Sequence, residues 1–437
     1  MLRLACEVLV LLLAGLGVAS AQPNFVLILA DDLGYGEVGA QHVGDVATPN
    51  IDAIASAGVT FTDGYVTASS CVPSRAGLLT GRYQQKFGIY INPTKPRRAT
   101  FGLPGGQVTL AEALRARGYR TGMVGKWHLG NKPEDHPQQH GFDEFFGVLE
   151  SDHPYFGEQE DSVKPFSNPI LRGTTPLPAS GYLTDTLAEE AASFITRNAS
   201  RPFFLYVPFT ATHGPLEAKP EMLARLGNIA DERRRVFAAM LASLDEAVGK
   251  ITQTIEDAGI ADNTVVVFLG DNGCGVTRRT GCLNLPLRGS KYSYNEGGIR
   301  IPFMMSWPGQ IPAGMRYREP VISFDLFATF LRAAGGTAPE AVDGVDLLPY
   351  LRGAGGAPHD YLFWGTESTS LVRRLFWGPE STVAVRKGDW KLLDGALYDL
   401  GRDIGETTDV AAANPDIVAD LRRAHDAWVA TLAPPLW

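Results

Sequence analysis

Residues 24–36 read N-F-V-L-I-L-A-D-D-L-G-Y-G. The apolar run at 25–30 is short and continuous, which is typical of a strand buried on both faces of a parallel sheet. The run ends abruptly in Asp31 and Asp32, and a glycine-rich turn follows. This stretch therefore predicts a central strand that carries two carboxylates at its carboxyl end.

The strand-and-turn pattern recurs along the chain after helical segments. Helices are predicted at residues 49–57, 108–118, 185–197 and 231–256. Further apolar strands with polar turns are predicted in Y-R-T-G-M-V-G-K-W-H-L-G, P-F-F-L-Y-V-P-F-T-A-T-H-G and N-T-V-V-V-F-L-G-D-N-G. Helices that alternate with apolar strands predict an α/β fold with a largely parallel sheet covered on both faces.

The character of the chain changes past about residue 340. A stretch rich in glycine, alanine and proline at 353–358 precedes residues 381–400, which predict short antiparallel strands with tight turns. A closing helix is predicted at 415–432. We therefore expect a large domain at 22–340 and a smaller α+β subdomain with an antiparallel sheet at 341–437.

Residues 1–21 predict an export signal. Arg3 precedes an apolar run that ends in Ala19-Ser20-Ala21, a small-residue cleavage pattern. The alternatives are a membrane anchor, for which the run is short, and a buried strand. No later stretch approaches the ~20 apolar residues of a spanning helix. We expect a secreted, periplasmic or lysosomal protein that is cut before Gln22 and has no membrane segment afterwards.

Charge limits the classes of partner. The 437 residues carry a formal net charge of −9, so neither nucleic acid nor an anionic membrane is an expected partner. An anionic substrate would have to be drawn in by a local cluster of cations. The sequence N-A-S at 198–200 is an N-glycosylation acceptor if the host is eukaryotic.

The cysteines single out one residue. Cys6 leaves with the signal, and Cys274 and Cys282 flank a short polar loop and form the natural disulfide pair. Cys71 is then left over in an oxidising compartment. Such an unpaired thiol is buried, reactive or chemically changed.

Cys71 also stands at a predicted helix start. Pro73 suits the first turn of a helix, and Arg75 lies about one turn further on, where it can face the same point. A helix N-terminus favours anions and predicts a lowered thiol pKa for Cys71. The pattern indicates a reactive centre, either a cysteine nucleophile or a group made from one.

Polar residues cluster where the predicted strands stop, and ligands of open α/β sheets bind at those carboxyl ends. These residues are Asp31, Asp32, Lys126, His128, His213, Asp271 and Asn272. The aspartates and the asparagine are hard oxygen donors that favour Ca²⁺ or Mg²⁺ over Zn²⁺. The alternative is that D-D and D-N are only turn residues after strands.

Cations accompany the carboxylates. With a metal, they would form a pocket for a tetrahedral oxyanion. The residues are Arg75, Lys126, His128, His213 and Lys291. The alternative is that the histidines are structural and that Lys291 is a solvated surface charge.

Residues 71–82, C-V-P-S-R-A-G-L-L-T-G-R, resemble the signature of the type I, formylglycine-dependent sulfatases. The other family elements are A-D-D-L-G-Y-G, G-K-W-H-L-G, H-G-F-D-E-F-F-G, T-x-x-H-G-P, G-D-N-G and R-G-x-K-x-x-x-x-E-G-G-I-R-x-P. The resemblance spans nearly the whole mature chain, and the combination of elements is highly specific.

The resemblance implies the fold of the alkaline phosphatase relatives, a large mixed sheet between helices with a small C-terminal sheet domain. Residues 22–340 would then be the sulfatase catalytic domain. Cys71 would be oxidised by a maturation enzyme to Cα-formylglycine, with Pro73 and Arg75 as part of the recognised motif. One Ca²⁺ would be held by residue 71 together with Asp31, Asp32, Asp271 and Asn272.

The resemblance also implies a mechanism. One hydroxyl of the aldehyde hydrate attacks the ester sulfur, and the other helps to expel sulfate and regenerate the aldehyde, which a plain serine or thiol cannot do. Arg75 would orient the formylglycine, and Lys126 and Lys291 would hold sulfate oxygens. His213 would be the general acid towards the leaving oxygen, and His128 would assist the formylglycine hydroxyl.

The resemblance favours a sulfated carbohydrate as substrate, with small aryl sulfates as surrogates. Loops at 131–156 and 275–287 are predicted to form the pocket mouth, where each polar side chain is otherwise a solvated loop residue. The side chains are those of His136, His140, His153, Arg278 and Arg279.

Three alternative functions stand beside this one. A formylglycine-type phosphonate monoester hydrolase or phosphodiesterase would share much of the pocket. An inactive sulfated-glycan-binding homologue would not need the complete set of site residues. A cysteine-dependent phosphatase would not need the carboxylate cluster.

Overall fold

The computed structural model describes residues 22–41, 44–93, 101–157, 168–178, 180–275, 277–365 and 383–437. The predicted signal peptide at 1–21 lies outside these residues, as does the side chain of Arg278. The boundary between 340 and 341 stays a prediction.

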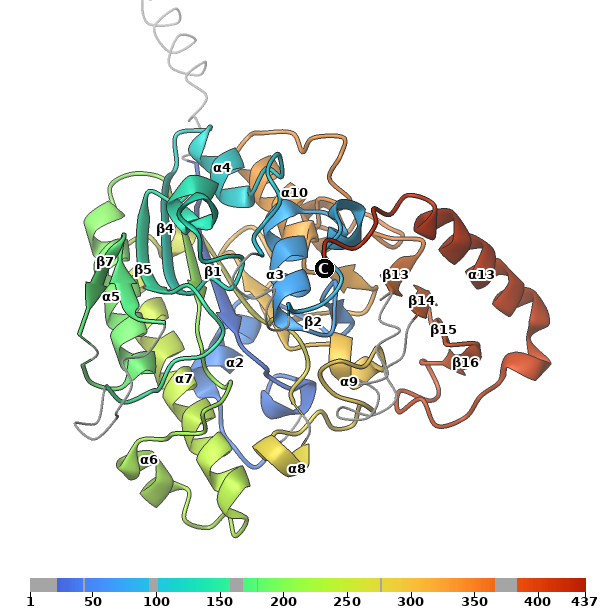
Figure 1. The fold of residues 1–437 in the computed structure, drawn as a ribbon, viewed down its shortest axis with the longest axis horizontal. Helices are drawn as coiled ribbons and strands as arrows, with labels where there is room; N and C mark the ends of the chain where they lie inside the picture. Colours follow the sequence, from blue (N-terminus) through green and yellow to red (C-terminus); the bar gives the residue numbers. More distant parts are fainter. Residues whose placement is uncertain are drawn as a thin grey trace, which may run out of the picture.

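The centre of the molecule is a ten-stranded mixed sheet (Figure 1). Its strands are β1 (Asn24–Ala30), β2 (Val59–Phe61), β4 (Arg120–Lys126), β5 (Glu144–Val148), β6 (Ile170–Arg172), β7 (Thr175–Leu177), β8 (Phe203–Pro208), β9 (Thr264–Gly270), β10 (Phe303–Ser306) and β11 (Met315–Tyr317). The order across the sheet is β11-β2-β10-β9-β1-β8-β4-β5-β6-β7. The run from β9 to β5 is parallel, whereas β10, β6 and β7 pair antiparallel with their neighbours.

Helices cover both faces of this sheet (Figure 1). The α-helices are α2 (Pro49–Ser56), α3 (Cys71–Thr80), α4 (Leu110–Arg115), α5 (Leu183–Asn198), α6 (Pro220–Arg225), α7 (Glu232–Asp257), α8 (Thr277–Thr280), α9 (Glu296–Ile299), α10 (Asp325–Ala333), α11 (Leu348–Leu351) and α13 (Pro415–Val429). The short 3-10 helices are η1 (Tyr35–Glu37), η2 (Gln84–Phe87), η4 (Pro133–Asp135), η5 (Pro137–His140), η6 (Ala261–Asn263) and η7 (Ala411–Ala413).

The packing of β1 explains its continuous apolar run. Phe25, Leu27 and Leu29 belong to the core cluster that includes α3, α4 and α10. Val26 and Ile28 point to the other face and pack in the cluster with α2, α5 and α7. Because both faces of the strand are buried, every position needs an apolar side chain.

The predicted helices are present, with small differences at their ends. The helix predicted at 108–118 is shorter, because Thr109 and Glu112 form a capping box that starts α4 at Leu110. Asp231 caps α7 by accepting a hydrogen bond from the Arg234 N–H.

The C-terminal sheet is antiparallel, as predicted. Its strands are β13 (Leu362–Gly365), β14 (Val383–Lys387), β15 (Trp390–Leu393) and β16 (Ala396–Asp399), in that order. Leu421 of α13 packs against it in a small core of its own. The buried Trp364 ties this sheet to the large domain, since its indole N–H donates to the Val66 carbonyl at 2.7 Å. A separate two-stranded parallel sheet consists of β3 (Gly64–Tyr65) and β12 (Val321–Ile322).

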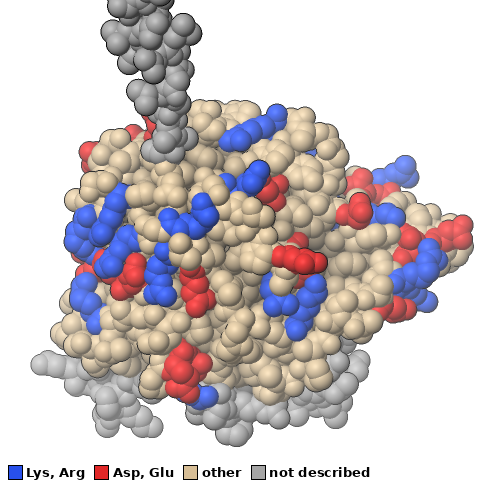
Figure 2. Space-filling model, turned by 90° about the horizontal axis from the view of Figure 1, so that it is seen from above, with Lys and Arg blue, Asp and Glu red and all other residues tan. Residues whose placement is uncertain are grey.

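The surface on the side of α4 and α10 carries charges of both signs on a largely uncharged background (Figure 2). Within the described parts of the chain, no helix is both long and apolar enough to cross a membrane. Asn198 of the glycosylation sequon is only 1% exposed, and its amide bonds to the Phe194 carbonyl and to Arg201. A glycan on this amide would not fit the folded chain.

Candidate active site

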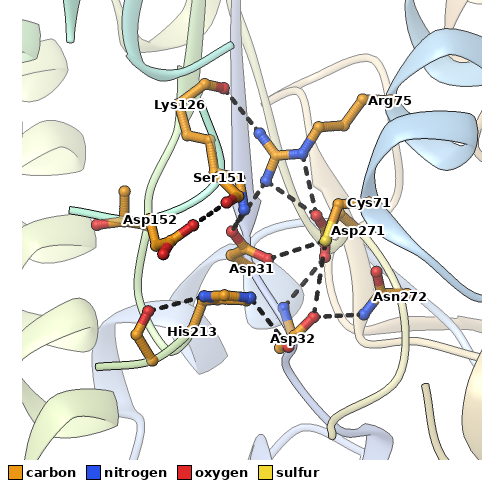
Figure 3. Close-up of polar contacts among 12 residues, drawn as sticks. Asp31, Asp32, Cys71, Arg75, Lys126, Ser151, Asp152, His213, Asp271 and Asn272 are labelled. Atoms are coloured by element: carbon orange, nitrogen blue, oxygen red, sulfur yellow. Dashed lines mark hydrogen bonds and ion pairs between the residues drawn. The ribbon is translucent and has the colours of Figure 1, made fainter. Parts of the chain in front are cut away.

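The parallel strands β9, β1, β8 and β4 end at one edge of the sheet, and each brings polar residues there. Asp31 and Asp32 follow β1, Asp271 and Asn272 follow β9, the turn after β8 carries His213, and β4 ends in Lys126 with His128 just beyond. Figure 3 shows the site residues that it labels converging from these separate elements. The edge predicted from the sequence therefore exists, although the roles of its residues remain proposals.

Two of these residues have an unusual backbone. Asp32 and His128 both have a φ angle of 58°, in the left-handed region that non-glycine residues seldom adopt. Residues held this way cost about 1–3 kcal/mol each and concentrate at functional sites. The strain marks the sharp turns by which the chain leaves β1 and β4.

The carboxylates form a compact buried set. Asp31, Asp32, Cys71 and Asp271 each offer one ligand atom, and these atoms all lie within 4.8 Å of one another. Asn272 donates its amide to Asp32 Oδ1 at 2.7 Å, and its own Oδ1 is buried without a hydrogen-bond partner. An orphaned amide oxygen beside clustered carboxylates fits a hard cation with oxygen ligands, such as Ca²⁺.

The electrostatics of the carboxylates support the same conclusion. Burial raises the pKa of Asp271 to about 6, and the neighbouring Asp31 carboxylate adds to this effect. Burial also disfavours the charge on Asp31, but Lys126, His213 and Arg75 hold the pKa of Asp31 well below its usual range. The opposite shifts of these two adjacent acids show that burial and mutual repulsion disfavour a negative charge on Asp271 when no cation lies between the carboxylates.

Arg75 connects α3 to this edge. Its Nε and Nη2 donate to Asp271 Oδ2 at 3.0 and 2.9 Å, and its Nη1 donates to the Lys126 carbonyl at 2.7 Å. The guanidinium also lies 3.4 Å from Asp31 Oδ2 and is fully buried. Arg75 thus holds together the ends of β1, β4 and β9, as its predicted position one turn after Cys71 allows.

Cys71 is the first residue of α3 and forms no disulfide. Its Sγ lies 3.5 Å from Asp31 Oδ1 and 3.2 Å from Lys291 Nζ. The lowered thiol pKa expected from the helix start is wrong. Burial raises the pKa of Cys71 well above its usual value, and Asp271 and Asp31 add to that effect against Lys291. An unmodified Cys71 is therefore a neutral thiol, which is a poor nucleophile.

The two lysines neutralise one aspartate each. Lys126 Nζ contacts Asp31 Oδ2, and Lys291 Nζ donates to both oxygens of Asp32 at 2.7 and 2.9 Å. Burial opposes the charge of Lys291, but Asp32 raises its pKa well above the usual value. Lys291 is thus a buried cation, so its alternative as a solvated surface charge is wrong.

The histidines differ in exposure. His213 Nδ1 donates to the Gly214 carbonyl at 2.8 Å, which leaves Nε2 directed at Asp32 Oδ2, 3.8 Å away. His128 is buried, and its Nδ1 has no partner. Burial lowers the pKa of both histidines, and Lys126 contributes to both shifts. Neutral imidazoles at this edge can exchange protons with a bound group.

The residues predicted at the pocket mouth differ in their contacts and exposure. His136 is structural, because its ring bonds to the Gly173 carbonyl and to the Gln138 N–H. His140 is structural as well, since its ring stacks on Trp127. His153 is buried with its Nδ1 donating to the Pro154 carbonyl, and Arg279 is exposed.

Ser151 and Asp152 also lie at this edge and were not predicted from the sequence. They follow β5, the next parallel strand beyond β4, and Ser151 donates to the Asp152 carboxylate. Figure 3 includes both among the polar contacts of the site. Their place after a strand of the same edge was the available signal, but the strand prediction did not reach residues 144–148.

The predicted disulfide between Cys274 and Cys282 is present. It closes the loop that follows Asp271 and Asn272. The Cys274 carbonyl accepts the Lys291 N–H at 2.9 Å. The disulfide loop therefore connects the metal-ligand candidates that follow β9 to the segment that carries Lys291.

With this geometry established, comparison with known proteins identifies the class. The family model described as Sulfatase matches residues 23–336, and the model described as N-sulphoglucosamine sulphohydrolase, C-terminal, matches residues 290–422. The chain belongs to the sulfatase family, and it is an enzyme of the sulfuric ester hydrolase class. The resemblance stated from the sequence motifs is confirmed.

Among individual relatives, the chain is 38% identical over 385 residues to arylsulfatase A of Homo sapiens, which covers 82% of this chain and 73% of the relative. It is 37% identical over 371 residues to N-acetylgalactosamine-6-sulfatase of Canis lupus familiaris, covering 79% of this chain and 69% of the relative.

The solved structures agree. Ps i-CgsB in complex with k-i-k-neocarrahexaose has a TM-score of 0.87 at 34% identity, over 95% of this chain and 94% of that one. The phosphonate monoester hydrolase of Agrobacterium radiobacter has a TM-score of 0.65 at 21% identity, over 94% and 95% of the two chains, which shows a shared fold only. The predicted fold class is therefore confirmed.

Proposed function

We propose that this protein hydrolyses sulfate esters of a sulfated carbohydrate, and small aryl sulfates as surrogates, through a formylglycine made from Cys71 beside a bound Ca²⁺. The observation that carries the proposal is the place of Cys71. Its sulfur lies at the start of a helix, buried among Asp31, Asp271 and Lys291, as a neutral thiol.

A Ca²⁺ fits the oxygen donors at this edge. Asp31, Asp32, Asp271 and Asn272 would hold it together with residue 71. Bound there, the ion would offset the repulsion among the carboxylates and withdraw charge from a sulfate oxygen. Arg75 would keep the Asp271 carboxylate in place, since two of its nitrogens already bond to it.

A formylglycine would supply, once hydrated, the attacking hydroxyl and the second hydroxyl that allows sulfate to be released. Its formation requires a maturation enzyme that reaches residue 71. Cys71, Pro73 and Arg75 are all buried in the folded chain. We therefore expect the maturation enzyme to read this motif before the chain folds.

The lysines and histidines would handle the sulfate group and the protons. Lys126 and Lys291 present buried ammonium groups beside residue 71, where they would bind sulfate oxygens and stabilise developing charge. His213, whose Nδ1–H donates to the Gly214 carbonyl, would act as the general acid towards the leaving oxygen in its protonated form, in which Nε2 also carries a proton and which Asp32, 3.8 Å away, favours. His128 would move a proton at the residue 71 hydroxyl.

Support for a carbohydrate substrate comes from the relatives. N-acetylgalactosamine-6-sulfatase is named for a sugar sulfate, and the Ps i-CgsB structure holds a saccharide. Arylsulfatase A motivates the aryl sulfates as surrogates. We propose accordingly that the enzyme is exported and is secreted, periplasmic or lysosomal.

The test is hydrolysis by protein co-expressed with a formylglycine-generating enzyme. A panel of p-nitrophenyl sulfate, defined sulfated saccharides and a phenylphosphonate monoester should show turnover of the sulfate esters first. Cys71→Ala should abolish turnover and keep the circular dichroism spectrum of the wild type. Retained sulfate hydrolysis in Cys71→Ala would sink the mechanism, and faster phosphonate hydrolysis would favour the phosphonate monoester hydrolase instead.

A further inference from the structure

A second buried charge cluster lies between the large domain and the C-terminal subdomain. In it Lys391 of β15 donates to Glu296 Oε1 at 2.7 Å and lies 2.9 Å from Glu406 Oε1. All three side chains are fully buried. Glu406 also accepts the Glu296 backbone N–H at 2.7 Å. The C-terminal subdomain thus bonds to both the side chain and the backbone of Glu296, the first residue of α9.

The same cluster is anchored on the other side by the large domain. Glu296 Oε2 accepts from Tyr65 Oη at 2.5 Å and from Arg300 Nη1 at 3.2 Å. Burial raises the pKa of Glu296, but Lys391 and Arg300 outweigh it and lower that pKa to about 2. Glu296 is therefore a fixed anion whose position depends on cations from both parts of the chain.

The α9 turn is in direct contact with a loop of the active site, so the position of Glu296 affects that loop. The Gly298 carbonyl accepts the Gly273 N–H at 3.0 Å, and Gly273 follows Asn272 directly. A Cβ on Gly273 would lie 1.8 Å from the Gly297 carbonyl oxygen, so the two backbones are in direct contact. A shift of α9 must therefore move the loop that carries Asp271 and Asn272.

The same segment, residues 288–300, carries Lys291 and lies against the chain just before Cys71. The Gly297 N–H donates to the Arg288 carbonyl at 2.7 Å, which closes the loop around Lys291. The Tyr292 N–H donates to the Ser69 carbonyl at 2.8 Å, two residues before Cys71. Residues 288–300 thus contact the loop after β9, the chain just before α3 and, through Lys291, Asp32 after β1.

We propose that Lys391 and Glu406 of the C-terminal subdomain are positioning residues of the active site, which act through Glu296 and the α9 turn. Their work is to hold the Asp271–Asn272 loop and Lys291 at the distances that a bound cation and a sulfate group require. The subdomain is thereby part of the catalytic apparatus through two residues that do not themselves touch the reacting atoms. The inference rests on the proposed function for its activity readout only.

The test uses the full-length protein as wild type, Lys391→Met and Glu406→Gln. Lys387→Met is the matched control, because Lys387 lies on the neighbouring strand and pairs with Asp420 at the surface. Each protein is stripped of metal and titrated with CaCl₂ while its melting temperature is followed. Lys391→Met should shift the Ca²⁺ midpoint upward by about tenfold or more, as expected when an outer support of a metal site is lost.

A purely structural role predicts a different result. In that case Lys391→Met would lower the metal-free melting temperature and leave the Ca²⁺ midpoint unchanged, which would overturn the proposal. If Lys391→Met does not fold, Glu406→Gln decides, because it keeps the shape of the side chain and should shift the midpoint in the same direction. Lys387→Met should match the wild type.

The activity readout separates the two proposals. For p-nitrophenyl sulfate, kcat/KM of Lys391→Met, corrected for conversion of residue 71, should fall by about 100-fold, the cost of a displacement near 1 Å. A wild type without sulfatase activity but with the predicted Ca²⁺ shift would refute the proposed function and keep this inference. An active wild type with equal midpoints and equal kcat/KM in the variants would refute the inference alone.

Discussion

The chain buries two clusters in which three carboxylates face three cations. The site cluster consists of Asp31, Asp32 and Asp271 with Arg75, Lys126 and Lys291. The α9 cluster consists of Asp63, Glu296 and Glu406 with Arg300, Arg386 and Lys391. The formal charge balance is the same, so charge alone does not tell a reactive site from a scaffold.

The two clusters differ in what is left unsatisfied. In the site cluster, the Asn272 Oδ1 atom is buried without a partner, and a neutral thiol sits among the carboxylates. His213 at its edge keeps 24% of its side chain exposed, which opens the cluster to solvent. In the α9 cluster, Glu296, Glu406 and Lys391 are fully buried, and Glu406 Oε1, which makes no hydrogen bond, is paired with the Lys391 ammonium at 2.9 Å. Incomplete satisfaction together with access is therefore what marks the chemical site.

The largest expected effect is on the site cluster. Asp271→Asn removes one proposed metal ligand and one partner of Arg75, so sulfate hydrolysis should fall by at least about 100-fold. The metal-free melting temperature should change little, because the substitution also relieves repulsion among three crowded carboxylates. Steady-state kinetics and thermal melts measure both, with the exposed Asp262→Asn as control.

An active Asp271→Asn would break the distinction between the clusters. It would mean that the carboxylates at this edge serve the fold and not the chemistry.

The α9 cluster should respond in the opposite way. Arg300→Met leaves Asp63 and Glu296 buried with fewer cations, and removing one partner of a buried ion pair costs about 3–5 kcal/mol in the free energy of unfolding. Denaturant unfolding measures the loss. Arg402→Met is the control, since Arg402 is 89% exposed and pairs with Asp399 at the surface, where ion pairs contribute little.

Equal stability of Arg300→Met and the wild type would show that the α9 cluster does not support the fold. The contrast with the site cluster would then have to be abandoned.

The smallest effect concerns a single buried pair. His359 Nε2 lies 2.9 and 3.0 Å from the two oxygens of Asp325. Burial opposes the charge of His359, but Asp325 raises its pKa above the ordinary value of 6.5. The protonated form thus stabilises the fold, fully at pH values below 6.5, and the contribution is lost as the pH rises through the folded-state pKa.

Melting temperatures of wild type and His359→Gln test this sign. Their difference should be largest below pH 6.5 and shrink at alkaline pH. A difference in melting temperature that grows with pH would contradict the stabilising role of protonated His359 and would mean that another group titrates.

Much of the site was predictable, because strand ends are local features. The apolar run before Asp31 and the run before Asp271 each show where a strand stops, and parallel strands meet at one edge. Cysteine counting isolated Cys71 for an equally local reason. The disulfide followed from the short loop between its two cysteines.

The remainder depends on contacts that local patterns do not encode. Lys391 and Glu296 are 95 residues apart in sequence, and nothing near Lys391 distinguishes it from an exposed strand lysine. The raised pKa of Cys71 required the depth of burial, which a helix start does not reveal. His136 was predicted to lie at the pocket mouth. Its structural role was not predictable, because its hydrogen bond to the Gly173 carbonyl joins two loops that are far apart in sequence.

The central claim is that residue 71 acts as formylglycine and not as cysteine. Peptide mass spectrometry of residue 71, in protein fractions that differ in sulfatase activity, tests it most directly. The account predicts that activity rises in proportion to the fraction of chains with formylglycine at position 71. Full activity in protein whose Cys71 is entirely an unmodified thiol would contradict it.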